Sequence, residues 1–401
     1  LILNAVIKKR LAALAAKTTI PTLLRLAMTA RGRGELQQAT THLREVFDRS
    51  GGDLRAAEAL LEVLLQRKAK VAIDDLLAVL QTQAQRRPEQ LPGLAELLLT
   101  ARRHKTLLTL VAKLKPARRS PTLKILAALA RARSGELARA RAELSALLPS
   151  PQGPRAALAL GRLYLRAGKA RRAAQVLASS VRRHRRNTSL LSLLSRARAE
   201  AGDKEGSLTP WARALGKHPK PQTRLAYAAA LARAGRWRQA LAQAQKVAGG
   251  RAAKAQKDTQ VPPSPALVAA AKNFIGFTLA DRDAELPRAA RLLADAAQLD
   301  PGRAYIIDSL GWLSFRRGHL AEARRLLSVA HRLAPREAEI AAHLAAVNAA
   351  LKRLPDALRL YRRAIALALS PKESAPWRQK LKQLTLRRVG NHGSAEAPAP
   401  H

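Results

Sequence analysis

The chain has 401 residues and no cysteine, and its 73 Lys and Arg residues outnumber 28 Asp and Glu to give a net charge of +45. The lack of cysteine excludes disulfides, a lipidated cysteine, a thiolate metal site and a cysteine nucleophile. Aromatic residues make up only 3% of the chain, and no run alternates apolar and polar residues as a strand does. The sequence therefore predicts an all-α protein.

The N-terminus begins with a short apolar run, residues 1–7, which is followed by Lys8, Lys9 and Arg10. A secretory signal has its positive residues before the apolar run, and a membrane-spanning helix needs about 20 apolar residues. We interpret this start as truncated or processed, so that any targeting signal is expected to lie outside this sequence. Residues 1–17 are expected to form a fragment of an amphipathic helix.

Pairs of helical segments joined at glycine turns follow along most of the chain, with different regularity in different parts. In chain order, we expect degenerate helical repeats over 1–117, regular repeats over 118–248, an insertion or linker rich in Pro and Gly over 249–266, three further repeats over 267–371, a capping helix over 372–389 and a disordered tail over 390–401.

A period of 34 residues is clearest in the C-terminal repeats. Ala289, Ala323 and Ala357 keep this step, with Gly276 and Gly311 in the helices before the first two of them. Two helix backbones approach closely only where one side carries little beyond Cβ. The small residues are therefore predicted packing contacts between the two helices of each repeat, together with Gly161 in the middle of the chain.

These patterns resemble the tetratricopeptide repeat, whose signature is L-G-x2-Y, then A-x3-F, A and P at a period of 34. Leu160, Gly161, Tyr164, Ala173 and Leu177 match it most closely. The resemblance implies a right-handed α-solenoid of about nine to ten helix-turn-helix units, in which the first helix of each unit lines a concave groove. It also implies a scaffold or adaptor that binds a protein or peptide partner.

A narrower resemblance covers roughly residues 270–368, on the phrases FTLADR from Phe277, IDSLGW from Ile307 and EIAAHL from Glu339. These phrases are similar to bacterial tetratricopeptide proteins, many of which are exported or associated with the envelope. The resemblance therefore favours a bacterial periplasm or envelope over the cytoplasm. Association with a membrane is compatible with it, although nothing in this sequence encodes such an association.

The groove residues follow from the resemblance, position by position. In the C-terminal repeats the groove is predicted to be aromatic and acidic, and aromatic residues are enriched at binding hot spots. The predicted partner-binding residues are Asn273, Phe277, Asp281, Tyr305, Asp308, Trp312, Phe315, Glu339 and His343. The family's peptide site for a C-terminal carboxylate, a Lys/Asn clamp, is not reproduced, because acidic and aromatic residues surround Asn273.

In the middle repeats the same groove positions are basic, and a second run of arginines follows one of the helices. The groove positions are Arg155, Arg162, Arg166, Arg196 and Arg233, and the run is Arg182, Arg183, Arg185 and Arg186. Polyanion or nucleic-acid binding through this arginine-rich surface is the alternative function. The competing interpretation is that dispersed Arg and Lys residues simply cover the solvent-facing side of each helix.

Catalytic and cofactor motifs are lacking. The sequence contains no H-E-x-x-H, G-x-x-x-x-G-K-[ST], G-x-G-x-x-G or G-x-S-x-G pattern, and its nine histidines are scattered. We therefore predict no enzyme activity, no catalytic residue, no metal, no cofactor and no small-molecule substrate.

Overall fold

The computed structural model describes residues 18–216, 219–249 and 263–393, and within these ranges the chain forms helices and turns but no strand. The prediction of an all-α fold is confirmed. The expected helix over 1–17, most of the insertion over 249–266 and the tail after residue 393 lie outside the described residues. The chain divides into two units, the first ending at Gly135 and the second beginning at Glu136.

The first unit consists of three helical hairpins and a further helix, around a core of buried leucines such as Leu60, Leu64, Leu94 and Leu98. Short 3-10 turns, Pro88–Gln90 and Pro116–Arg118, precede its third hairpin and its last helix. Its helices are α2 (Ile20–Arg33), α3 (Leu36–Arg49), α4 (Leu54–Arg67), α5 (Lys70–Arg86), α6 (Leu91–Thr100), α7 (His104–Lys113) and α8 (Pro121–Arg133).

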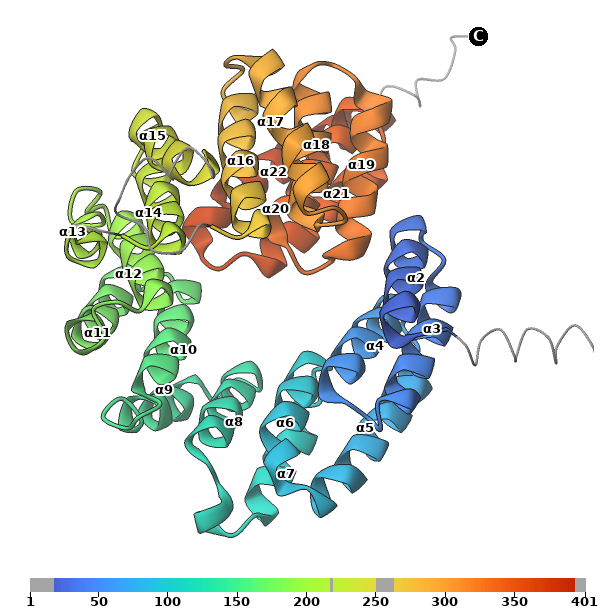
Figure 1. Cartoon of the computed structure of the whole chain (residues 1–401), viewed down its shortest axis with the longest axis vertical. Coiled ribbons are helices and arrows are strands. Elements are labelled where there is room, and N and C mark those ends of the chain that lie inside the picture. The colour runs from blue at the N-terminus through green and yellow to red at the C-terminus, as the bar shows by residue number, and fades with distance from the viewer. Residues whose placement is uncertain (1–17, 217–218, 250–262, 394–401) are drawn as a thin grey trace, which may run out of the picture. The chain divides into compact units, whose positions relative to one another are not determined.

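The second unit continues with successive hairpins, shown from green to red in Figure 1. Its helices are α9 (Leu137–Ala146), α10 (Gly153–Arg166), α11 (Ala170–Arg183), α12 (Thr188–Glu200), α13 (Thr209–Leu215), α14 (Pro221–Arg233), α15 (Trp237–Ala248), α16 (Pro265–Asp281), α17 (Leu286–Leu299), α18 (Ala304–Arg316), α19 (Leu320–Leu333), α20 (Ala338–Ala350), α21 (Leu354–Leu367) and α22 (Pro371–Gly393).

Each hairpin turns where the backbone adopts a left-handed conformation at the end of its first helix. Gly318, with φ of 80°, occupies this position between α18 and α19, and glycine adopts such angles without steric cost. The equivalent position one period later is Lys352, with φ of 58°. The turn geometry is therefore kept even where the residue is not glycine.

The closest helix contact in a hairpin joins a glycine of the first helix to a leucine of the second. A Cβ built on Gly311 would lie 2.7 Å from Cγ of Leu327, so that alanine cannot enter without a shift. Ala289, Ala323 and Ala357 in the second helices are fully buried. The same glycine contact recurs between Gly276 and Leu293 at 2.7 Å and between Gly161 and Leu177 at 2.9 Å.

The hairpin of α12 and α13 is irregular, because α13 has only seven residues. Trp211 on this short helix is fully buried and packs near Tyr227, with ring centroids 6.2 Å apart. The short helix thus still contributes a large side chain to the core that includes Leu191 and Leu231. Beyond it, α15 packs directly against α16, so the second unit continues across the insertion.

The final helix, α22, covers the apolar side of the last hairpin. Trp377, Leu381 and Leu384 pack against the core that includes Leu358 and Tyr361 of α21. A repeat array needs such an element, because its last hairpin would otherwise expose apolar surface. The helix continues past residue 389, where the tail was expected to begin, and ends at Gly393. A single glycine costs about 1 kcal/mol in a helix and does not by itself end it.

Candidate functional site

Three consecutive first helices, α16, α18 and α20, lie side by side and carry all of the predicted partner-binding residues (Figure 1). On α18, Tyr305, Asp308, Trp312 and Phe315 are spaced at three and four residues, which places them on one helix face. On α20, Glu339 and His343 are one turn apart. The 34-residue period places these faces next to one another.

A buried ion pair lies at the centre of this cluster. Nδ1 of His343 is 3.0 and 3.1 Å from the two carboxylate oxygens of Asp308, and their side chains are only 15% and 9% exposed. Burial alone would lower the pKa of His343. The charge and hydrogen bond of Asp308, with smaller effects of Glu339 and Asp281, nevertheless raise this pKa above its ordinary value.

Aromatic rings enclose the ion pair. The ring of Trp312 stacks on His343 with centroids 4.3 Å apart and contacts Phe315 at 5.0 Å. Phe277 of α16 approaches His343 at 5.8 Å, and the indole Nε1 of Trp312 donates to Asp281 at 3.3 Å. These side chains hold one another in place, which makes the face a rigid platform.

The remaining predicted residues of this region lie around the platform, in different environments. Asn273 is buried, and its side-chain oxygen has no hydrogen-bond partner in the described structure. Tyr305 is 41% exposed, and Glu339 is exposed as well. Desolvation by the surrounding protein raises the pKa of Glu339 despite the opposing charge of His343. Because water reaches this carboxyl, its exposure limits the increase.

The predicted basic patch is divided by the structure into two places. Arg155, Arg162 and Arg166 are exposed on α10, whereas the arginines from Arg182 to Arg186 are exposed at the end of α11 and in the loop after it. Of this patch only Arg162 lines a cleft, together with Arg196 of α12 and Arg233 of α14. The arginines of the patch therefore lie on two neighbouring helices of one hairpin and in the loop that follows it.

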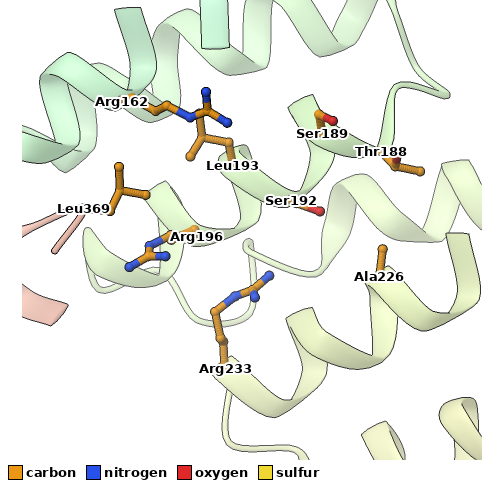
Figure 2. Close-up of a pocket in the computed structure, with 9 residues that line it drawn as sticks. All are labelled: Arg162, Thr188, Ser189, Ser192, Leu193, Arg196, Ala226, Arg233 and Leu369. Atoms are coloured by element: carbon orange, nitrogen blue, oxygen red, sulfur yellow. The ribbon is translucent and has the colours of Figure 1, made fainter. Parts of the chain in front are cut away.

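The cleft has a volume of about 350 Å³, and Figure 2 shows its three arginines extending from three different helices. Its lining residues are Arg162, Thr188, Ser189, Ser192, Leu193, Arg196, Ala226, Arg233 and Leu369. Nη2 of Arg196 lies 2.9 Å from Oε2 of Glu373, and Nε of Arg196 lies 3.0 Å from Oε1 of Glu200.

The electrostatics of Arg196 and Arg233 differ, although both line the cleft. Burial would lower the pKa of Arg196, but the hydrogen bonds and charges of Glu373 and Glu200 together raise it. The pKa of Arg233 is lowered, first by desolvation and then by the charge of Arg196. Arg233 is nevertheless partly exposed to solvent, so its desolvation arises from the surrounding residues of the cleft and not from full burial.

Leu369 lines the cleft from the far end of the chain and Glu373 pairs there with Arg196, and neither was among the predicted site residues. Nζ of Lys372 donates to the carbonyl oxygens of Ala199 and Glu200, at 3.2 Å each. The partners are more than 170 residues apart in sequence, and no local pattern signals such a contact. Arg162, Arg196 and Arg233 were predicted as basic groove positions from the repeat pattern.

His331, on α19, is a second histidine that is enclosed by protein, but among the described residues it has no carboxylate partner such as His343 has in Asp308. Its Nδ1 is buried with no hydrogen-bond partner in the described residues. Desolvation, with the charges of Arg363, Arg359 and Arg332, lowers the pKa of His331 to about 4. In the unfolded state His331 binds a proton below pH about 6.5, whereas in the folded state it stays neutral until the pH approaches about 4.

Acid is thus expected to destabilise the chain through His331, as the pH falls from about 6.5 towards about 4. Between pH 7 and pH 4.5, the free energy of unfolding should fall by about 2 kcal/mol less in His331→Gln than in the unchanged chain. The variant lacks the side chain that, in this pH range, binds a proton only in the unfolded state. The exposed His319, replaced in the same way, should leave the loss unchanged. Urea denaturation at both pH values measures it, and an undiminished loss in His331→Gln would contradict the assignment.

The described residues contain neither a candidate metal centre nor a helix that could span a membrane. No group of three or more His, Asp or Glu side chains there could hold a metal ion. No helix there is both long and apolar enough to cross a membrane.

The repeated hairpins, their 34-residue period and their glycine-to-leucine contacts give this chain the architecture of a tetratricopeptide repeat solenoid. No family model matches it. Over 55 residues it is 44% identical to a TPR repeat-containing protein of Pseudomonas aeruginosa, a match that spans 14% of this chain and 9% of that relative's length.

Two solved structures also match, each with a TM-score below 0.5. A tetratricopeptide repeat protein from Parabacteroides merdae matches with a TM-score of 0.43 and 14% identity, over 65% of this chain and 97% of that one. Yeast Tom70 matches with a TM-score of 0.41 and 13% identity, over 96% of this chain and 92% of that one.

Proposed function

We propose that this chain is a protein-interaction scaffold and not an enzyme, and that it holds a segment of a partner protein against the joint face of α16, α18 and α20. Repeat arrays create extended concave surfaces that serve for binding. The observation that carries the proposal is the rigid platform of Asp308, Trp312 and His343, beside which Tyr305 and Glu339 remain exposed.

The platform has the features of a preorganised binding surface. Its supporting side chains are already fixed by the ion pair and the ring contacts, so that little side-chain entropy remains to be lost on binding. Tyrosine is enriched among residues that dominate binding energy. The exposed carboxylates of Asp281 and Glu339 favour a partner segment that carries Lys or Arg.

The test is partner capture from a lysate of the source cell at 300 mM salt after nuclease treatment. The Tyr305→Ala/Glu339→Gln variant should lose a specific protein that the unchanged chain retains, because both side chains are exposed and their loss leaves the fold intact. Leu299→Ala, at a similarly exposed position on α17, is the matched control and should retain the protein. Equal capture by all three proteins would refute the proposal.

Polyanion binding is the second candidate, favoured by the exposed residues Arg182, Arg183, Arg185 and Arg186. Phosphate contacts make affinity fall steeply with salt. Binding of a 20-base-pair DNA duplex should then lose about one unit of salt slope for each arginine that contacts a phosphate. If Arg182→Gln/Arg183→Gln leaves the slope unchanged, these arginines contact no phosphate.

A further inference from the structure

The cleft described above follows one face of α12. Thr188, Ser189, Ser192, Leu193 and Arg196 lie along it, from the first turn of the helix to its last. At 1.5 Å per residue this face is about 12 Å long, which matches about four residues of an extended peptide. We call this elongated cleft, bounded by α10 and α14, the α12 slot. Its shape suits a chain segment better than a compact ion.

The two ends of the slot differ in chemistry. One end offers the hydroxyl groups of Thr188, Ser189 and Ser192, and the other carries the guanidinium groups of Arg196 and Arg233 (Figure 2). Neither Arg162 nor Arg233 forms an ion pair with another described residue, although the negative charge of Glu339 acts on Arg233 from a greater distance. Arg196 has two partners, Glu200 on its own helix and Glu373 of the last helix.

The chain itself shows which chemistry the arginine end accepts. The carboxylate of Glu373 reaches Arg196 across the fold, and Lys372 fixes the same segment by its hydrogen bonds to the end of α12. Leu369 packs against the cluster that contains Leu190, Leu193 and Leu194. A short piece of the C-terminal helix region thus occupies one end of the slot, with a carboxylate against an arginine.

We propose that the α12 slot binds an acidic peptide segment of the partner, and that Glu373 competes with this segment for Arg196. The proposal rests on the proposed function and names one part of the partner's chemistry. Arginine suits the role, because its planar fork binds carboxylates through two parallel hydrogen bonds. The platform on α16, α18 and α20 and the α12 slot would then contact segments of opposite charge.

A fluorescein-labelled peptide of six glutamates is the probe, with six glutamines as its uncharged control, and binding is followed by anisotropy at 150 mM salt. Arg162→Gln/Arg233→Gln should weaken binding about tenfold, since two charged contacts are lost. Arg182→Gln/Arg183→Gln removes the same charge outside the slot and should change affinity less than about twofold. Equal weakening by both double variants would mean that the peptide is attracted to the basic protein in general, and would overturn the proposal that it binds in the α12 slot.

Competition is tested by freeing Arg196. Glu373→Gln should bind the glutamate peptide several-fold more tightly, because the internal carboxylate no longer occupies the arginine. Lys372→Ala loosens the same segment without changing that carboxylate, so it should act in the same direction even if Glu373→Gln disturbs folding. Unchanged or weaker binding by both variants would overturn the competition.

Two controls separate this inference from the proposed function and from phosphate binding. If the glutamate peptide does not bind but the lysate partner still depends on Tyr305 and Glu339, only the slot is wrong. If Arg162→Gln/Arg233→Gln abolishes binding of a DNA duplex but not binding of the peptide, the slot binds phosphate groups and the proposal is overturned. Far-ultraviolet circular dichroism verifies that each variant keeps its helices.

Discussion

Replacing Gly311 with alanine is expected to destabilise the unchanged chain but to stabilise the Leu327→Ala variant. In the native hairpin the new methyl group would lie 2.7 Å from Cγ of Leu327, and such overpacking costs about 1–3 kcal/mol. Truncation of Leu327 removes this 2.7 Å contact and leaves a contact of 3.2 Å with Cβ of Leu326, which a shift of a few tenths of an ångström relieves. Alanine then contributes its helix propensity, about 1 kcal/mol over glycine, and fills part of the cavity.

Leu327→Ala alone should lower the free energy of unfolding by about 3 kcal/mol, because the side chain is fully buried. Urea denaturation of the four proteins of the cycle gives the coupling between the two positions. Leu299→Ala, at a partly exposed leucine of α17, should cost far less and serves as control. If Gly311→Ala has the same sign in both backgrounds, the two side chains are not in the contact described.

Replacing Asp308 with alanine is expected to lower the free energy of unfolding by about 3–5 kcal/mol near pH 6. The replacement leaves the buried His343 without the carboxylate that stabilises its charged form, and breaking a buried pair in this way is strongly destabilising. Asp281→Ala removes an exposed carboxylate near the same cluster and should cost less than about 1 kcal/mol. Comparable losses would contradict the central role of the pair.

The pair also predicts a dependence on pH in the alkaline direction. The pKa of His343 is raised in the folded state, so the stabilisation is fully present below the unfolded value of about 6.5 and is lost as the pH rises through the folded value. His343→Gln should therefore show a smaller fall in Tm between pH 6 and pH 9 than the unchanged chain. An equal fall would assign the effect to other groups.

The sequence predicted the hairpins well, because the small and large residues that pack two helices together recur at fixed positions within each repeat. Gly311, Ala323 and Leu327 are close in the chain, and only small residues permit the approach of the two helices. The spacing of four residues was sufficient to place Asp308 and Trp312 on one helix face, and the 34-residue period supplied the rest. It also related Arg162 to Arg196, since equivalent positions of neighbouring repeats lie side by side.

The sequence was less informative about which polar residues partner one another. Nothing in the pattern distinguishes Asp308, buried against His343, from Glu339, which remains exposed nearby. The approach of Glu373 to Arg196 depends on the curvature of many successive hairpins, to which each repeat adds a small rotation. Such a contact follows from the whole array and leaves no signal in any one repeat.

The most direct test of the scaffold is a photo-crosslinking amino acid placed at Tyr305, with the same group at Leu299 as control, both about 41% exposed. After irradiation in the source cell, we expect the Tyr305 position to form a crosslink to one protein and the Leu299 position to form none to it. The Tyr305→Ala/Glu339→Gln variant, added in excess to a lysate, should fail to compete for that protein. Crosslinks that are the same from both positions, or that join only nucleic acid, would contradict partner binding on this face.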